Sequence, residues 1–408
     1  MKDSLAFIEL IEESLFGQFK AFETTSYRIS QRITEAYQEA KVESRHFSPS
    51  TGYGYSDIAR EKLEEVFAKV FGAEAALVRP HFASATHAIV VALRGLLEPR
   101  DVLYSVCGAP YDTIATAIGK TAKDRNTLRA HGVEYKQTDL MPDGSFDTDN
   151  ILKTIKEDKI KLLFLQRSRG YAWRKSLNIA KITELCKEVK AVDKDVIIVV
   201  DNCYGEFTEI SEPTHVGADV CMGSLIKNPG GGLAPTGAYI VGRDDLIQTI
   251  ADGFISPGIG GEIGSYESSY RPFFQGLFMA PHTVAQCLKG AALFAAAYEK
   301  LGYTVMPKAN DARSDITQSI QLGSADKLIA FCQAIQSASP IEGHVMPMPW
   351  DMPGYEDEVI MAAGTFVQGA SIELSADGPI REPYTAYLQG GLTYEHCRLA
   401  LKKTLDKM

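Results

Sequence analysis

One lysine stands between a run of small residues and three consecutive glycines, in the stretch "GSLIKNPGGG". The nearest charged neighbours of Lys227 along the chain are Asp219 and Arg243, whereas a solvated surface lysine usually stands among other charges. This contrast favours a lysine that is buried or lies in a cleft. A lysine must be neutral to form a Schiff base, so we expect burial or nearby positive potential to lower its pKa.

An aspartate follows the apolar run "DVIIVV", upstream of the lysine. A pyridine-type cofactor that serves as an electron sink needs a protonated ring nitrogen, and a carboxylate at the end of a rigid strand can keep it so. Asp201 is therefore a candidate for this contact. It could equally cap the turn after a buried strand, but the downstream Lys227 favours the cofactor role.

A phosphate and an aromatic contact can be assigned in the same way. In "HFASATHAIVVAL", small residues open a helix, whose backbone N–H groups can bind a phosphate. The candidates are Ser84, Ala85 and Thr86, with the hydroxyl of Ser224 as a further donor. Tyr111, in "GAPYDTIATAIG", could lie against the face of the cofactor ring. Ser84 could instead be a helix N-cap, and Tyr111 an ordinary half-buried core aromatic.

From about residue 58, helical blocks alternate with apolar strands such as "DVLYSV", "KLLFLQ" and "DVIIVVD". This alternation predicts an α/β fold with a mostly parallel central sheet covered by helices, and ligands bind beyond the carboxyl ends of such strands. A smaller α+β domain follows, where the elements become shorter. We expect an N-terminal helical arm at 1–50, a large α/β domain at 51–285 and a small C-terminal domain at 286–408.

The composition limits the partners. The 408 residues carry a net charge of −10 without a dense basic run, which argues against nucleic acid or an anionic membrane surface and favours a small-molecule substrate. The amino terminus is acidic rather than signal-like, and no apolar run could span a bilayer. Seven scattered cysteines predict a cytoplasmic chain without disulfides or zinc. The histidines form no H-E-x-x-H motif, so we expect no metal site.

The ordered set of motifs resembles the fold-type I pyridoxal-phosphate (PLP) enzymes of Cys/Met metabolism. It looks most like the aluminium-resistance or methionine gamma-lyase-like branch, which is related to cystathionine beta-lyase. The resemblance runs from about Tyr53 to the carboxyl terminus, through "YSDIAREKLEEVFAKVFGAEAALV", "ASATHAI", "VVDNCYGEF", "GSLIKN" and "GLFMAPHTVAQCLKG". It implies a PLP-dependent transferase-like fold, a Schiff base at Lys227, a pyridine contact at Asp201 and a stacking ring at Tyr111.

The resemblance also implies that active sites are shared between subunits. In the family a tyrosine reaches the phosphate of the neighbouring subunit, so Tyr53 or Tyr55 is the matching residue, and a homodimer or homotetramer is expected. An arginine usually stands two residues after this tyrosine, but here Asp57 follows Tyr55. Arg60 is the candidate to replace that arginine.

Two further family contacts depart from the usual pattern. Where the family usually carries an Asn-Pro pair, this chain has "LQRSRGYAWRKSL", which makes Ser168 or Arg169 the candidate to meet the cofactor. A late arginine normally clamps the substrate carboxylate, because a guanidinium can bind it with two hydrogen bonds. Arg381, in "SADGPIREPYTAYLQGG", is the candidate for this clamp and could also be a surface residue.

The function that the resemblance implies is a PLP-dependent carbon–sulfur lyase. An amino acid of the cystathionine, methionine or cysteine type would lose its thiol by β- or γ-elimination, with Lys227, Tyr111 and Tyr55 as the catalytic residues. An aminotransferase and a catalytically silent PLP-fold protein with a binding or regulatory role are the alternatives. The glycines at 230–232 form either a flexible turn or a place where backbone approaches a ligand closely.

Overall fold

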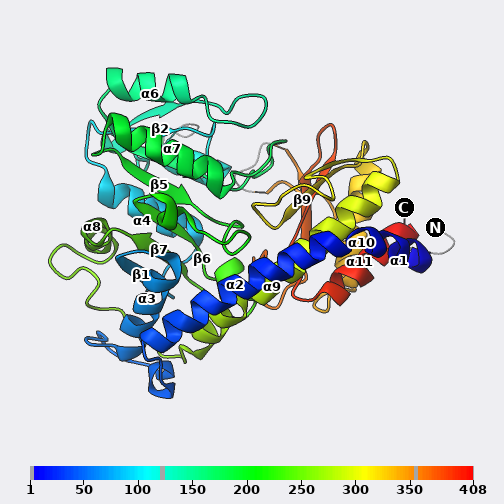
Figure 1. Cartoon of the computed structure of the whole chain (residues 1–408), viewed down its shortest axis with the longest axis horizontal. Coiled ribbons are helices and arrows are strands. Elements are labelled where there is room, and N and C mark those ends of the chain that lie inside the picture. Colours follow the sequence, from blue (N-terminus) through cyan, green and yellow to red (C-terminus); the bar gives the residue numbers. More distant parts are fainter. Residues whose placement is uncertain (1–3, 120–124, 353–356, 408) are drawn as a thin grey trace.

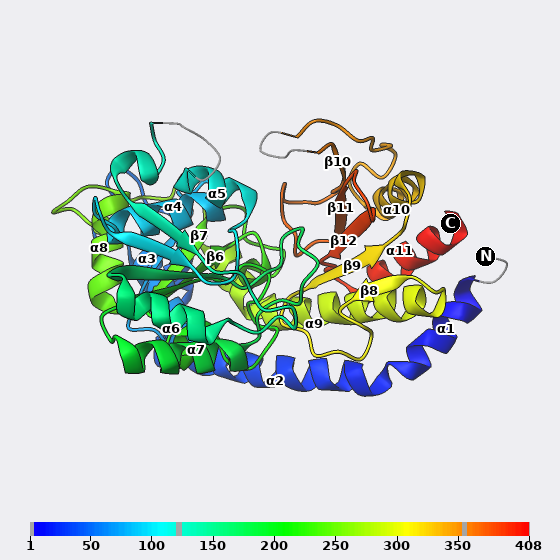
Figure 2. The same cartoon turned by 90° about the horizontal axis from the view of Figure 1, so that it is seen from above.

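The computed structural model describes residues 4–119, 125–352 and 357–407. Two long helices, α2 (Phe16–Glu39) and α9 (Arg271–Lys300), pack side by side and run from a large sheet to a smaller one (Figures 1 and 2). A short helix α1 (Ser4–Ser14) precedes them and contacts the carboxyl-terminal helix α11 (Tyr394–Lys407). These helices therefore connect the two halves of the molecule.

The large sheet has seven strands in the order β1-β7-β6-β5-β4-β2-β3. Strand β7 is antiparallel to both of its neighbours, and the other adjacent strands pair in parallel. The predicted mostly parallel sheet is thus confirmed. The strands are β1 Ala75–Arg79, β2 Val102–Ser105, β3 Glu134–Gln137, β4 Ile160–Gln166, β5 Ile197–Asp201, β6 Val220–Ser224 and β7 Ala238–Gly242.

Helices cover both faces of this sheet. Successive side chains of a strand point to opposite faces, so Ile197 and Val199 enter one core whereas Ile198 and Val200 enter another. Helices α4, α5 and α8 pack on the first face, and α3, α6 and α7 on the second. Their bounds are α3 Ile58–Phe71, α4 Ala85–Leu96, α5 Asp112–Ile118, α6 Thr148–Glu157, α7 Ile179–Val192 and α8 Asp244–Phe254.

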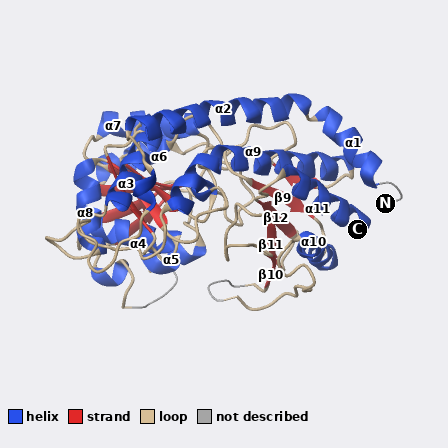
Figure 3. Cartoon of the chain, turned by 90° about the horizontal axis from the view of Figure 1, so that it is seen from below, coloured by secondary structure: helices blue, strands red, loops and turns tan. Residues whose placement is uncertain are grey.

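The second sheet is antiparallel throughout and has the order β10-β11-β12-β9-β8, with helix α10 packed against three of its strands (Figure 3). It gives the expected smaller α+β part. Helix α9 crosses residue 286, where we place the domain boundary, so that division stays a prediction. The elements are β8 Thr304–Met306, β9 Thr317–Gln321, α10 Ala325–Ala338, β10 Val359–Ala362, β11 Ser375–Pro379 and β12 Thr385–Gln389.

Short 3-10 turns complete the connections, and one of them follows the lysine motif. They are η1 Ser44–Phe47, η2 Arg129–His131, η3 Pro213–Val216 and η4 Asn228–Gly230. Among the described helices, none is both long and apolar enough to cross a membrane. Within the same residues, no group of three or more His, Cys, Asp or Glu side chains could hold a metal ion.

The glycine run after the lysine packs against helix α9. A Cβ atom at Gly231 would lie 2.4 Å from the carbonyl oxygen of Gly276, and Gly231 has a φ of +55°. A Cβ atom at Gly230 would lie only 1.8 Å from the carbonyl oxygen of Leu225. The glycines therefore allow close backbone contact within the protein, which fixes the end of the lysine segment on α9.

We predict that Gly231→Ala lowers the free energy of unfolding by about 1–3 kcal/mol, because the new Cβ would collide with backbone and the residue would keep a positive φ. Urea unfolding measures this change. The matched control is Gly17→Ala, at an exposed position near the start of helix α2, where a Cβ meets nothing within 4 Å. The free energy of unfolding of the control should stay the same or rise by up to about 1 kcal/mol. Equal stability of the two variants would contradict the role of Gly231.

Candidate functional site

A cavity of about 140 Å³ lies where the large sheet meets the small one. Six of the sequence-predicted residues, all from the large part, lie around one cavity: Lys227, Asp201, Tyr111, Ala85, Thr86 and Ser168. Their arrangement follows from the topology, because β5 and β6 are neighbouring parallel strands whose carboxyl ends meet at one edge. Predicted ligand contacts far apart in the sequence are thus brought together.

The small sheet supplies the opposite wall of this cavity. Asp377 of β11 pairs with Tyr387 of β12, and Gln389 lies two residues further along β12. Directly opposed residues and residues two apart share a face, so all three side chains point the same way. These three residues and Thr317 of β9 line the cavity with Lys227.

Asp201 follows the alternation of its strand onto the face covered by α4. Its carboxylate is buried and accepts a hydrogen bond from the backbone N–H of Cys203 at 3.1 Å. Burial raises the pKa of Asp201, and the nearby charge of Lys227 partly offsets that effect. The Asp201 carboxylate accepts one hydrogen bond from the backbone, so it can still accept another from an N–H group of a ligand.

Lys227 is half-buried, and its Nζ atom lies 4.1 Å from the centroid of the Tyr204 ring. Burial lowers the pKa of Lys227, but the acidic groups of Cys203, Tyr204 and Asp201 outweigh this effect and raise it above the ordinary value. Our expectation of a lowered pKa is therefore wrong for the chain by itself. Its surroundings favour a protonated lysine, which the nearby negative charge of Asp201 and the face of the Tyr204 ring stabilise.

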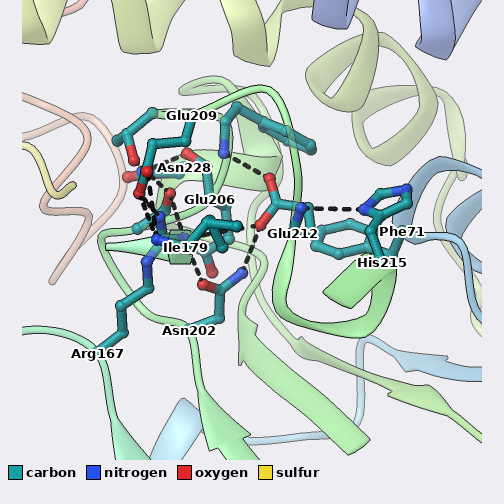
Figure 4. Close-up of polar contacts among 12 residues, drawn as sticks. Phe71, Arg167, Ile179, Asn202, Glu206, Glu209, Glu212, His215 and Asn228 are labelled. Carbon is teal, nitrogen blue, oxygen red and sulfur yellow. Dashed lines mark hydrogen bonds and ion pairs between the residues drawn. The ribbon is translucent and has the colours of Figure 1, made fainter. Parts of the chain in front are cut away.

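A buried polar network, which we call the Arg167 network, holds the turn that follows Asp201 (Figure 4). Arg167 Nη1 donates to Asn202 Oδ1 at 2.8 Å, and Arg167 Nη2 donates to Glu209 Oε2 at 2.5 Å. Asn202 Nδ2 donates in turn to Glu212 Oε2 at 2.8 Å. Because Asn202 is the next residue after Asp201, this network fixes where the aspartate points.

Glu206 links the same turn to the lysine segment. Its Oε1 atom accepts from the Tyr239 hydroxyl at 2.9 Å, and its backbone carbonyl accepts from Asn228 Nδ2 at 2.9 Å. Asn228 Nδ2 also donates to the carbonyl of Tyr204 at 3.0 Å, so the residue after Lys227 is tied to the ring beneath the lysine. Burial raises the pKa of Glu206 to about 8.

Four predicted cofactor contacts do not line this cavity in the chain. Ser84 is the N-cap of α4, where its hydroxyl accepts from the His87 N–H at 3.1 Å, which matches the alternative role we give it. Ser224 is buried at the end of β6. Tyr53 and Tyr55 lie in the loop that precedes α3, with exposed side chains and ring centroids 5.7 Å apart. Their roles as phosphate contacts stay predictions.

The predicted arginine contacts are placed elsewhere. Arg381 lines a larger neighbouring cavity of about 1070 Å³, and its Nη1 atom lies 2.9 Å from Asp357 Oδ2. Arg169 lines that outer cavity too and pairs with buried Asp315 at 3.2 Å. Arg60 is buried against carbonyls of its own chain, including that of Gly54 at 2.7 Å.

The replaced Asn-Pro segment and its strand contribute four residues to the cavity, namely Gln166, Ser168, Gly170 and Tyr171. Ser168 is one of our two candidates there, whereas sequence analysis missed Gln166, whose Oε1 accepts from the Tyr111 N–H at 2.7 Å. The rule that singled out Asp201 could have found Gln166, because it ends the neighbouring strand β4. No comparable signal marks Asp377, since its position depends on how two separate sheets meet.

Comparison with known proteins places this architecture among PLP-dependent folds. A PLP-dependent protein from Escherichia coli, YhfS, has a TM-score of 0.63 with this chain at 15% identity, and covers 96% of this chain and 97% of that one. At that identity the likeness concerns the fold alone. It agrees with the predicted fold class of a mostly parallel sheet with a smaller second part.

The family model of methionine gamma-lyase matches residues 4–408, and the chain belongs to that family. The Bacillus subtilis protein YnbB is 50% identical over 399 residues, which cover 98% of this chain and 94% of YnbB. A candidate cystathionine beta-lyase involved in aluminium resistance from Clostridium acetobutylicum has a TM-score of 0.97 at 47% identity, covering 100% and 96% of the two chains. A carbon–sulfur lyase involved in aluminium resistance from Clostridium novyi has a TM-score of 0.96 at 47% identity, covering 99% and 96%.

We predict that Glu206→Gln removes a pH dependence of stability. The folded carboxyl group has a pKa of about 8 against an ordinary 4.5, so the native chain keeps a proton that the unfolded chain releases between these values. The free energy of unfolding of the parent should therefore contain a term that falls as pH rises from 4.5 to 8, by at most about 1.4 kcal/mol per pKa unit.

Urea unfolding at pH 5 and pH 8 measures the effect as the difference between the parent and Glu206→Gln. Every other titrating group is common to the two proteins, so the difference isolates Glu206. The exposed Glu13→Gln variant serves as the control and should follow the parent at both pH values. If Glu206→Gln also follows the parent, the carboxyl group is already ionised at pH 5 and our assignment is wrong.

Proposed function

We propose that this chain is a PLP-dependent carbon–sulfur lyase acting on a sulfur-containing amino acid. The observation that supports the proposal is the meeting of Lys227 and Asp201 in one cavity at the carboxyl edge of the large sheet. Membership of the methionine gamma-lyase family and the likeness to a carbon–sulfur lyase support the same reaction. The leaving thiol would depart from the β or the γ carbon of the substrate.

The donor set around the cavity fits PLP. Lys227 would hold the aldehyde carbon covalently, and Asp201 would accept from the protonated ring nitrogen. The ring of Tyr111 would cover one face, and the first backbone N–H groups of α4, at Ala85 and Thr86, would bind the phosphate. When bound, the cofactor supplies a conjugated electron sink for negative charge at the α carbon.

The chain's own residues would move the protons. Lys227, once free, would take the α-proton, and it must be neutral to do so. Asp201 helps to raise the pKa of Lys227, so a protonated ring nitrogen on Asp201 would remove part of the negative potential that keeps the lysine charged. Filling the site would thus move the lysine toward the state that the reaction needs.

The overall reaction balances as amino acid plus water giving thiol, 2-oxo acid and ammonia. The carbon–sulfur bond breaks, its electron pair leaves with sulfur, and the thiolate takes up a proton. An aminotransferase would use the same two residues but requires a second oxo acid as amino acceptor. A 2-oxo acid formed together with thiol in the absence of an acceptor separates the lyase from that alternative.

We predict that Lys227→Ala lowers thiol release by at least about a thousandfold, because the covalent attachment and the base are lost together. Thiol release from cystathionine and methionine, measured with a thiol reagent, and 2-oxo acid formation from cysteine measure the loss. Lys20→Ala, an exposed lysine, is the control and should keep full activity. Unaltered thermal unfolding shows that the Lys227 variant is folded.

Borohydride reduction followed by peptide mapping provides a second readout of the same residue. The parent should absorb in the visible range when it holds PLP, and the reduced cofactor should map to the peptide that contains Lys227. A protein that stays colourless with added PLP and releases no thiol would support the catalytically silent alternative. Retained cofactor-dependent elimination in Lys227→Ala would refute the role of the lysine.

Exposed Tyr53 and Tyr55 support a further part of the proposal, an oligomer with shared active sites. Their side chains are 71% and 63% exposed and lie away from their own cavity, so a partner subunit could receive them. We predict that the PLP-loaded protein sediments as a dimer or tetramer, and that Tyr55→Ala weakens PLP binding without changing that assembly. A PLP-loaded monomer in sedimentation velocity would refute the proposal.

A further inference from the structure

Asp377 is a buried carboxylate in the wall of the cavity that contains Lys227. It lies on β11 of the small sheet, whereas Lys227 follows β6 of the large sheet, so the two residues reach the cavity from separate parts of the molecule. Gln389 Nε2 donates to Asp377 Oδ2 at 3.3 Å, and the Tyr171 side chain forms a second hydrogen bond with the carboxyl group. Asp377 therefore faces the space where a substrate attached near Lys227 would extend.

No cationic side chain among the described residues forms an ion pair with Asp377. Burial raises its pKa to about 7, and the hydrogen bonds of Tyr171 and Gln389 oppose this rise. Another buried carboxylate of the small part, Asp315, has Arg169 as its partner at 3.2 Å. A buried carboxylate without a cation is costly unless a ligand supplies the missing charge.

The neighbours of Asp377 indicate which kind of ligand group it would bind. The amide Nε2 of Gln389 can only donate, and a tyrosine hydroxyl next to a carboxylate is a good donor. Both contacts therefore favour the ionised carboxylate, which accepts hydrogen bonds and attracts positive charge. The ionised carboxylate can accept from both donors and still attract a cation, whereas a protonated Asp377 would have less capacity to accept hydrogen bonds.

Resting on the proposed function, we propose that Asp377 selects substrates whose sulfur substituent carries an ammonium group. The α-amino end of such a substrate lies at Lys227, and the group beyond sulfur extends to the opposite wall. There the ammonium group forms the ion pair that Asp377 lacks in the chain, and Gln389 and Tyr171 hold the carboxylate in place. The small sheet thereby sets specificity, while the large sheet supplies the chemistry.

The test compares two substrates of equal length, S-(2-aminoethyl)-L-cysteine and S-propyl-L-cysteine, which end in an ammonium and a methyl group respectively. The corresponding homocysteine pair covers elimination at the γ carbon. PLP-loaded parent enzyme should favour the ammonium substrate in kcat/KM of thiol release. Asp377→Asn should lower kcat/KM for that substrate by about 10- to 100-fold and leave the propyl substrate within about threefold.

Asp326→Asn is the matched control, because it removes the same charge from the exposed surface of the small part. It should keep the parent's preference between the two substrates. Thermal unfolding and the cofactor absorbance of Asp377→Asn should match the parent, which separates altered selection from a damaged site. An equal fall of kcat/KM for both substrates in Asp377→Asn would overturn the specificity role.

Binding measurements separate this inference from the proposed function. Lys227→Ala incubated with PLP should bind the aminoethyl compound at least about tenfold more tightly than the propyl compound in calorimetry, and the added Asp377→Asn change should remove the difference. If the aminoethyl compound binds more tightly than the propyl compound but the parent releases no thiol in any assay, the proposed lyase function is wrong and the ammonium site at Asp377 is supported. If the parent releases thiol but prefers neither substrate in binding or in turnover, the lyase function is supported and the specificity role of Asp377 is wrong.

Discussion

Electrostatic coupling between Lys227 and Asp201, which line the same cavity, is the constraint on which the rest of the site depends. Burial disfavours both charges, and each charge reduces that cost for the other. Tyr204 adds the face of its ring to the lysine side of this coupling. The two residues therefore have to keep fixed positions, because a displaced partner would leave a buried charge uncompensated.

Two structural devices keep these positions, one on each side of the coupling. The Arg167 network holds Asn202 and so orients Asp201 at the end of β5. On the other side, Gly230 and Gly231 let the chain after Lys227 approach backbone more closely than any Cβ atom permits. Asn228 connects the two devices, because its side chain donates to carbonyls of the turn that follows Asp201. Rigid support of this kind is what a pre-organised cofactor site requires.

The sequence predicts those features that depend on short stretches of the chain and on general rules of sheet topology. Apolar runs of strand length predict the large sheet, and the edge rule for parallel strands predicts that Asp201 and Lys227 come together. The surroundings of Lys227 were harder to predict, because sparse charge along the chain says nothing about Cys203 and Tyr204, which raise its pKa from positions distant in sequence. The position of Arg381 likewise depends on Asp357, which holds it in the outer cavity.

Asp377 shows why substrate selection is the least predictable feature. Its side chain faces the cavity because β11 pairs with β12 in one register and because the small sheet meets the large sheet at that face. A shift of one residue in that register would turn Asp377 away from the cavity and bring a neighbour in its place. Residues of β11 and β12 that face the cavity can therefore be substituted without disturbing Asp201 or Lys227. If the large sheet supplies the chemistry and the small sheet the selection, as we propose, a substitution on the small sheet would change the preferred substrate and leave the proposed catalytic residues in place.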